Sequence, residues 1–162
     1  MTQEQIDEIL SKHKLWMDGM EGGKKADFSN ADLRDVECSW AKLYGANLRG
    51  ADLRGVDLQC ADLGYADLSN ANLRGANLSY ANLSAANLSN ANLCLAALSN
   101  AEIRYTNLHG TVLDGADLSG ANLRGTDLNK ALLSLTKMRK PDADKVNLTQ
   151  EQRDRIFIIK ED

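Results

Sequence analysis

The side chains that could perform catalysis in this 162-residue chain are few and scattered. Its two histidines, His13 and His109, lie far apart in the sequence, and no cysteine stands beside either one to form a nucleophile and base pair. The three cysteines are odd in number and lack the spacing of metal ligands, which predicts reduced thiols and neither a disulfide framework nor a zinc site. The sequence therefore favours no catalytic centre, no metal and no cofactor, and we expect a protein that is not an enzyme.

Charged and aromatic residues recur at regular intervals instead. Arg34, Arg54 and Arg74 are spaced 20 residues apart, and Asp32 and Asp52 lie two positions before the first two. This column could be a narrow basic stripe for an anion or an acidic partner. Alternatively, the arginines are neutralised by the neighbouring aspartates on a solvated surface, where such pairs are common and weak.

Four large aromatic residues recur at twice that interval, 40 residues apart. Trp40 and Tyr80 form one such set, and Tyr65 and Tyr105 form another. Exposed aromatic side chains aligned on a rigid surface are typical of a protein contact surface. We therefore expect these four residues to be candidates for binding a protein partner.

The element that must position these residues is a five-residue repeat, visible in stretches such as ADLSNANLRGANL. From residue 26 to 140 the chain holds 23 uninterrupted pentads, with Leu at the centre of 19 and Ala two places earlier in 17. Asp or Asn lies between these two positions in 16 pentads, and Gly or Asn lies two places after the centre in 12.

A repeat of five residues fits neither a regular α-helix nor a regular β-strand. In a helix it would carry the leucines around every face, and in a plain strand it would send them to alternate sides. Two inward residues within one pentad fit a very short extended segment, and Gly or Asn then supplies the positive φ of a type II turn. Each pentad is thus one side and one corner, and four pentads close a square coil that hydrogen-bonds to its neighbours.

These A(D/N)LxG-type pentads, such as ADLRG, ANLRG and ADLSG, resemble the pentapeptide repeat family. The resemblance implies an all-β solenoid, a right-handed quadrilateral parallel β-helix, and the 115 residues of the repeat predict about six coils. Some members of that family imitate duplex DNA and bind type II topoisomerases such as DNA gyrase, which gives an alternative function.

Both ends of the chain depart from the period and are expected to cap the coil. Residues 1–25 hold a capping box, Thr2 with Gln5, and an amphipathic helix over 3–18; residues 26–140 form the β-helix; residues 141–162 form a C-terminal cap with a second capping box, Thr149 with Gln152. The tail after that box is ambiguous between helix and strand. Some relatives dimerise through this end, and the residues expected to make cap or dimer contacts are Ile156, Phe157, Ile159, Leu132 and Leu135.

Charge argues against the DNA-mimic alternative. Residues 26–140 carry 12 acidic and 11 basic side chains, whereas duplex DNA carries one negative charge per about 1.7 Å. No face is basic throughout, so nucleic acid is not an expected partner, and no apolar run suits a membrane span or a signal peptide. We expect a cytoplasmic scaffold or interaction module that binds a protein not identifiable from the sequence.

Overall fold

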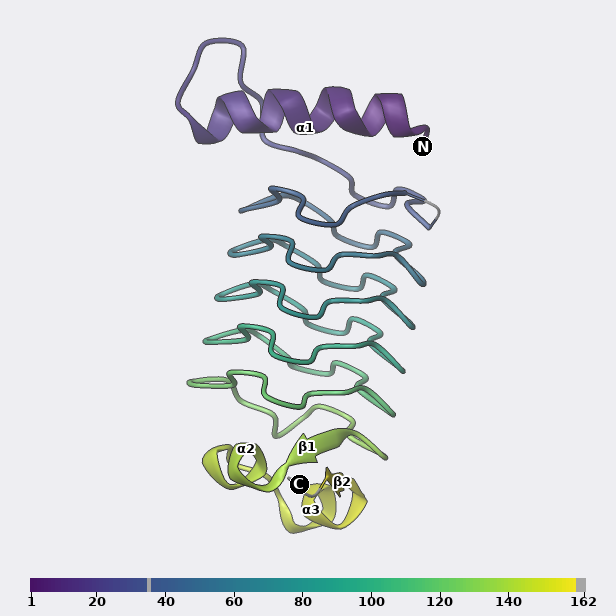
Figure 1. The fold of residues 1–162 in the computed structure, drawn as a ribbon, viewed down its shortest axis with the longest axis vertical. Helices are drawn as coiled ribbons and strands as arrows, with labels where there is room; N and C mark the ends of the chain where they lie inside the picture. Colours follow the sequence, from purple (N-terminus) through teal and green to yellow (C-terminus); the bar gives the residue numbers. More distant parts are fainter. Residues whose placement is uncertain (35, 160–162) are drawn as a thin grey trace.

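The computed structural model describes residues 1–34 and 36–159. The chain forms a tall stack of square coils with helices at both ends (Figure 1). The regular elements are α1 (Gln3–Met17), β1 (Lys137–Arg139), α2 (Lys140–Lys145), α3 (Gln150–Arg155) and β2 (Phe157–Ile159).

The coils are joined by parallel bridges between residues 20 positions apart, from Asp27↔Asn47 to Asp117↔Lys137. Four pentads therefore make one turn of the stack, as the sequence predicts. Most sides contribute two amides that point to the following coil: Leu78 N–H donates to the Ala97 carbonyl at 2.7 Å and Tyr80 N–H donates to the Ser99 carbonyl at 3.0 Å.

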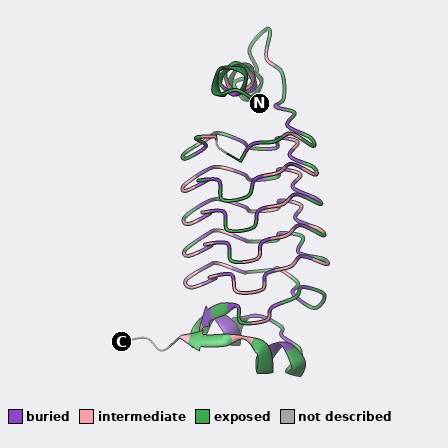
Figure 2. Cartoon of the chain, turned by 90° about the vertical axis from the view of Figure 1, so that its right-hand side faces the viewer, coloured by how far each residue is buried: buried purple, intermediate pink, exposed green. Residues whose placement is uncertain are grey.

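The interior is filled by the two apolar positions of each pentad, and Figure 2 shows that buried residues recur in every coil. All 23 central residues are buried, and Leu78 is 0% exposed. The alanine position is buried along most of the stack and half-buried at residues 31, 36, 41 and 126. The predicted packing of leucine and alanine inside the coil is confirmed.

The corners have the conformation that the repeat predicts. The carbonyl of most central residues accepts the amide of the residue three positions later, as in Ala81 N–H to Leu78 O at 3.0 Å. The residue two places after the centre takes a positive φ at 20 corners, whether or not it is glycine or asparagine. Lys130 is a corner residue that does not adopt a positive φ.

The Asp or Asn before each centre stabilises the same turn. Asn82 Oδ1 accepts the Ser84 amide at 3.0 Å, and Asn82 Nδ2 donates to Asp62 Oδ1 of the preceding coil at 2.9 Å. Side chains of this type commonly form such turns. These residues therefore close the corner and also connect successive coils.

Helix α1 lies across the N-terminal end of the stack (Figure 1). The predicted capping box of Thr2 and Gln5 begins it. Ile6 is 1% exposed and belongs to the main core, while His13 is fully buried, and its Nδ1 accepts the Ala26 amide at 3.1 Å. No helix in the described part of the chain is long and apolar enough to cross a membrane.

The 20-residue spacing continues beyond the last pentad, where Lys140 and Pro141 were expected to end it. Strand β2 pairs in parallel with β1, in the register Lys137↔Phe157, so the tail after α3 is a strand. Helices α2 and α3 replace two sides of this last turn, and α3 begins with the predicted capping box of Thr149 and Gln152. Leu148, between the two helices, is buried in the core like a central leucine.

Candidate interaction surface

The residues that could support catalysis do not come together. His13 is buried beneath α1, whereas His109 is exposed on the outside of a distant coil. Among residues 1–34 and 36–159 no group of three or more His, Cys, Asp or Glu side chains could hold a metal ion. The three cysteines are free thiols, and burial raises the pKa of Cys38 to about 11.

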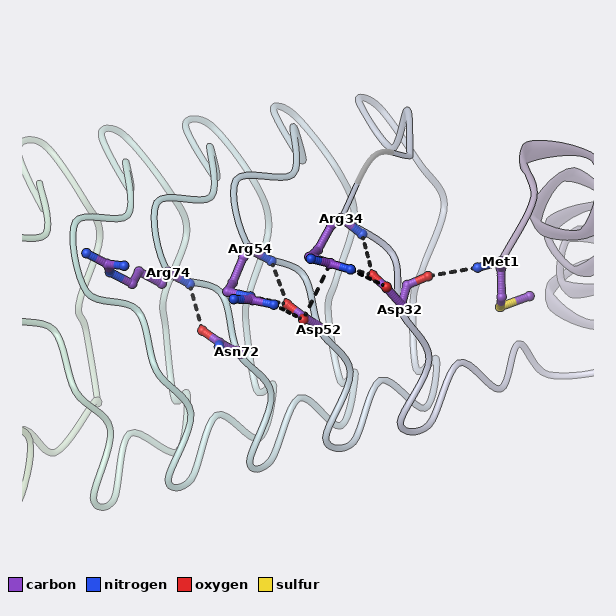
Figure 3. Close-up of polar contacts among 7 residues, drawn as sticks. All are labelled: Met1, Asp32, Arg34, Asp52, Arg54, Asn72 and Arg74. Carbon is purple, nitrogen blue, oxygen red and sulfur yellow. Dashed lines mark hydrogen bonds and ion pairs between the residues drawn. The ribbon is translucent and has the colours of Figure 1, made fainter.

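The arginine column lies along one side of the stack, and two of its three members are bound to carboxylates (Figure 3). Arg34 binds Asp32 through Nε and Nη2, at 2.9 and 2.7 Å, and Arg54 binds Asp52 in the same way at 2.8 and 2.6 Å. These contacts hold the pKa of both carboxyl groups below the ordinary value.

Arg74 differs because its coil has asparagine instead of aspartate. Its backbone amide donates to Asn72 Oδ1 at 3.3 Å, and no carboxylate of the described residues pairs with its guanidinium. The column is therefore largely neutralised, in agreement with the second of the two interpretations of the sequence.

The two aromatic sets flank one and the same side of the stack. We call this side the aromatic face; it consists of residues 41–45, 61–65, 81–85, 101–105 and 121–125. Trp40 and Tyr80 lie at the corner where the face begins, and Tyr65 and Tyr105 lie at the corner where it ends. Their side chains are strongly exposed, at 71%, 59%, 64% and 63%.

The middle of the aromatic face carries residues of very different size, from Gly64 and Ser84 to Tyr44, Arg104 and Arg124. Tyr44 lies on the face itself, with its ring centroid 5.4 Å from that of Tyr65. Gly64 gives this ring room, because a Cβ there would lie 3.2 Å from Tyr44 Cδ2. Ser84 follows one coil later, and its buried Oγ has no hydrogen-bond partner in the described chain. Gly64 and Ser84 are therefore small side positions between the two aromatic corner columns.

All four corner aromatics occupy a strained backbone conformation. Their φ values are +62° at Trp40, +56° at Tyr65, +61° at Tyr80 and +56° at Tyr105. The left-handed region costs a side-chain-bearing residue about 1–2 kcal/mol, and glycine or asparagine adopts it more easily. Folding alone would favour the small residues that most other corners carry, so these aromatic side chains oppose local stability.

The C-terminal candidates separate into buried and exposed residues. Ile156 packs against the core and Ile159 is half-buried in β2. In contrast, Leu132, Leu135 and Phe157 are 52%, 70% and 56% exposed. Ile158, which the sequence did not single out, is 40% exposed at the open end of the stack.

Comparison with known proteins identifies the family. The model described as "Pentapeptide repeats" matches in eight copies, over residues 24–50, 37–75, 76–115 and 116–150. This chain belongs to the pentapeptide repeat family. No curated protein sequence matches it significantly.

Solved structures of other pentapeptide repeat proteins are similar to this one. HetL, a pentapeptide repeat protein involved in heterocyst differentiation regulation in the cyanobacterium Nostoc sp. strain PCC 7120, is 34% identical, with a TM-score of 0.52 over 71% of this chain and 60% of HetL. This chain thus spans less than two thirds of HetL. Rfr23 from the cyanobacterium Cyanothece 51142 is 32% identical over 81% of this chain and 69% of Rfr23, with a TM-score of 0.38.

A third similar structure is QnrB1, a plasmid-mediated fluoroquinolone resistance protein. It is 22% identical over 78% of this chain and 79% of QnrB1, with a TM-score of 0.44. The structures in this family imply a right-handed quadrilateral β-helix for the present pentapeptide repeat protein.

Sequence reasoning missed two features of this pentapeptide repeat protein. It treated the two aromatic sets as separate, although a corner residue borders both the side that precedes it and the side that follows it. It also missed Tyr44, which is 40% exposed on the aromatic face and lies at a side position, outside both corner columns. Working out from the register which side lies between the two corner columns would have revealed the shared face and the position of Tyr44 on it.

Proposed function

We propose that this pentapeptide repeat protein is a non-enzymatic scaffold whose aromatic face binds a protein partner. The observation that carries the proposal is the combination of exposure and strain at Trp40, Tyr65, Tyr80 and Tyr105. Strained positions that persist against local stability are concentrated at functional sites. Tyrosine and tryptophan are also enriched where proteins bind each other, because their rings provide large contact areas at low entropic cost.

The rest of the molecule is suited to hold that face rigidly. The interior is closely filled with leucine, so the coils hold the rings at fixed heights. We propose about six coils, with α1 and the segment after β1 acting as caps that cover the open ends. The proposed location is the cytoplasm, and neither a membrane nor nucleic acid is a proposed partner.

The alternative function is that of a DNA mimic acting on gyrase or another topoisomerase. The resemblance to QnrB1 suggests it, but at 22% identity that likeness concerns the fold. The near balance of 12 acidic and 11 basic residues in the repeat argues against it, because duplex DNA has one negative charge per about 1.7 Å. A supercoiling assay with gyrase, in which inhibition by an excess of this protein would support mimicry, tests the alternative.

A second proposed contact is a homodimer through the C-terminal end, made by the exposed Leu132, Leu135 and Phe157. Light scattering of the full chain tests it. We expect twice the monomer mass for the wild type and the monomer mass for Phe157→Glu. The measurement is made at about 100 μM, a concentration at which even weak complexes form. A monomeric wild type under this condition would rule out the contact.

The scaffold proposal is tested by affinity capture from extract of the native cell, with the partner identified by mass spectrometry. The Trp40→Asn/Tyr80→Asn variant removes two rings and keeps side chains that tolerate a positive φ. The matched control is Leu95→Asn, which makes the same kind of change at an exposed corner with a φ of +60° on another side. We expect the wild type and the control to retain the same partner and the aromatic variant to lose it; equal retention by all three would refute the proposal.

A further inference from the structure

A pocket of about 460 Å³ lies where the aromatic face meets α2, at the C-terminal end of the stack. Its walls are residues 120–125 of the last complete side of that face, together with Arg139, Asp142, Lys145 and Val146. This volume is within the usual range of small-molecule sites, about 300–1,000 Å³. The pocket exists because a helix stands where the next side of the coil would otherwise lie.

Because α2 stands in place of the next side, the hydrogen bonds between successive coils are interrupted next to the pocket. In the preceding coil, Ile103 N–H and Tyr105 N–H donate to the carbonyls of Asn122 and Arg124, at 2.9 and 3.0 Å. The equivalent amides one coil later belong to Leu123 and Gly125. Their expected acceptors fall within α2, and neither amide donates to an acceptor in the described chain.

A neighbouring amide shows what can replace the missing carbonyl. Gly120 N–H donates at 3.1 Å to Asp142 Oδ2, which also accepts Arg139 Nε at 2.7 Å. Asp142 is 6% exposed. An anionic oxygen therefore already caps one amide of this edge. Amides left without a partner next to a pocket are unfavourable unless water or a ligand accepts them.

The charge of the pocket is positive. Arg124, Arg139 and Lys145 provide three cations and Asp142 provides one carboxylate, so the lining carries a net charge of +2. Arg124 and Lys145 are exposed, and no carboxylate of the described residues pairs with either. Guanidinium groups bind phosphate oxygens in a bidentate manner, and lysine adds a point charge.

We propose that this pocket binds a dianionic phosphate group, held by the Leu123 and Gly125 amides and by Arg124 and Lys145. A phosphate monoester carries about −1.5 to −2 charges at pH 7 and offers three acceptor oxygens, which matches both the net charge and the two amide donors. A single carboxylate would neutralise only half of the charge. The inference is independent of the proposed protein partner, since the pocket is complete in one chain.

Two sources could supply this group, a small phosphorylated molecule or a phosphorylated side chain of a protein. The ring of Tyr105 lies over Gly125, where a Cβ would approach its Cδ1 to 2.4 Å, and therefore stands at the rim of the pocket. The experiment below separates the sources by comparing glycerol 3-phosphate with a phosphoserine peptide.

The test is a titration of the full chain with inorganic phosphate at pH 7.5 and constant ionic strength, followed by ¹H–¹⁵N NMR. We expect saturable shifts that are largest at the Leu123 and Gly125 amides. In Arg124→Gln/Lys145→Gln the dissociation constant should rise at least tenfold. The matched control, Lys42→Gln/Arg74→Gln, removes the same charge from other coils and should bind like the wild type.

The outcomes are distinct. Absence of saturable shifts up to 50 mM phosphate, or equal affinity in Arg124→Gln/Lys145→Gln and the control, would overturn the site. If glycerol 3-phosphate binds more tightly than the peptide, a small molecule is the source, and the reverse order indicates a phosphorylated protein. Capture by the aromatic face is measured separately through Trp40→Asn/Tyr80→Asn, which leaves the pocket residues intact, so failure of the phosphate site is separable from failure of the proposed function.

Discussion

Two adjacent alanines should respond in opposite ways to the same substitution. Ala85 is a corner residue with φ of +57°, and Ala86 is an inward residue that is 1% exposed. Glycine relieves the left-handed strain at Ala85, which should raise the free energy of unfolding by about 1 kcal/mol. At Ala86 glycine removes a buried methyl group, about 0.8 kcal/mol, and adds about 0.5–1 kcal/mol of backbone entropy to the unfolded state.

We therefore expect Ala85→Gly to stabilise the protein and Ala86→Gly to destabilise it by about 1.3–1.8 kcal/mol. For a chain of this size, each kcal/mol shifts the melting temperature by about 2–4 °C. Thermal unfolding followed by circular dichroism would give a rise of about 2–4 °C for Ala85→Gly and a fall of about 3–7 °C for Ala86→Gly. A fall in both variants would refute the assignment of corner and interior positions.

Three further predictions concern the core, the turns and the N-terminal helix. Leu78→Ala should cost about 2–5 kcal/mol in chemical denaturation, because a fully buried leucine leaves a cavity. Asn82→Ala should cost about 1–2 kcal/mol, because it removes two hydrogen bonds, including the one to Asp62. Burial lowers the pKa of His13 below its ordinary value of about 6.5, so the unfolded state binds the proton more readily. Hydrogen exchange of the α1 amides should therefore accelerate as the pH falls below about 6.5, after correction for intrinsic rates.

Each of these has a result that would count against it. Leu78→Ala with wild-type stability would contradict the filled interior. Asn82→Ala within about 0.3 kcal/mol of the wild type would remove the turn-closing role of this side chain, since surface changes are usually within about 0.5 kcal/mol. Protection of α1 that stays constant between pH 7 and pH 5, or an equal change in a His13→Gln variant, would exclude His13 as the group responsible.

The sequence predicts the coil because its physical cause is local. Leu at the centre, Ala two places earlier and Gly or Asn at the corner specify an inward pair and a turn in every pentad, without reference to distant residues. The unbroken register then fixes which residues stack. The capping boxes of α1 and α3 were predictable for the same reason, since both partners lie within three residues.

The C-terminal turn and the surface could not be predicted in the same way. Helices α2 and α3 take the place of two sides of the last turn, while Leu148 before α3 and β2 after it keep the 20-residue spacing. This arrangement involves the whole turn and cannot be deduced from one pentad. The pocket next to α2 depends on that exchange. The aromatic face requires knowing that two corner columns border one side. In contrast, the strain at Tyr65 and Tyr80 follows from their corner position in the repeat, where a positive φ is expected.

The central claim, that a partner binds the aromatic face, is tested most directly by photocrosslinking from single positions. A photoreactive phenylalanine would replace Tyr65 or Tyr105 on the aromatic face, and Ser89 or Arg54 on two other sides, in the native cell. We predict that the same protein cross-links from Tyr65 and Tyr105 and from neither of the other positions. Cross-linking of a partner from Ser89 or Arg54 but not from the aromatic face would contradict the claim.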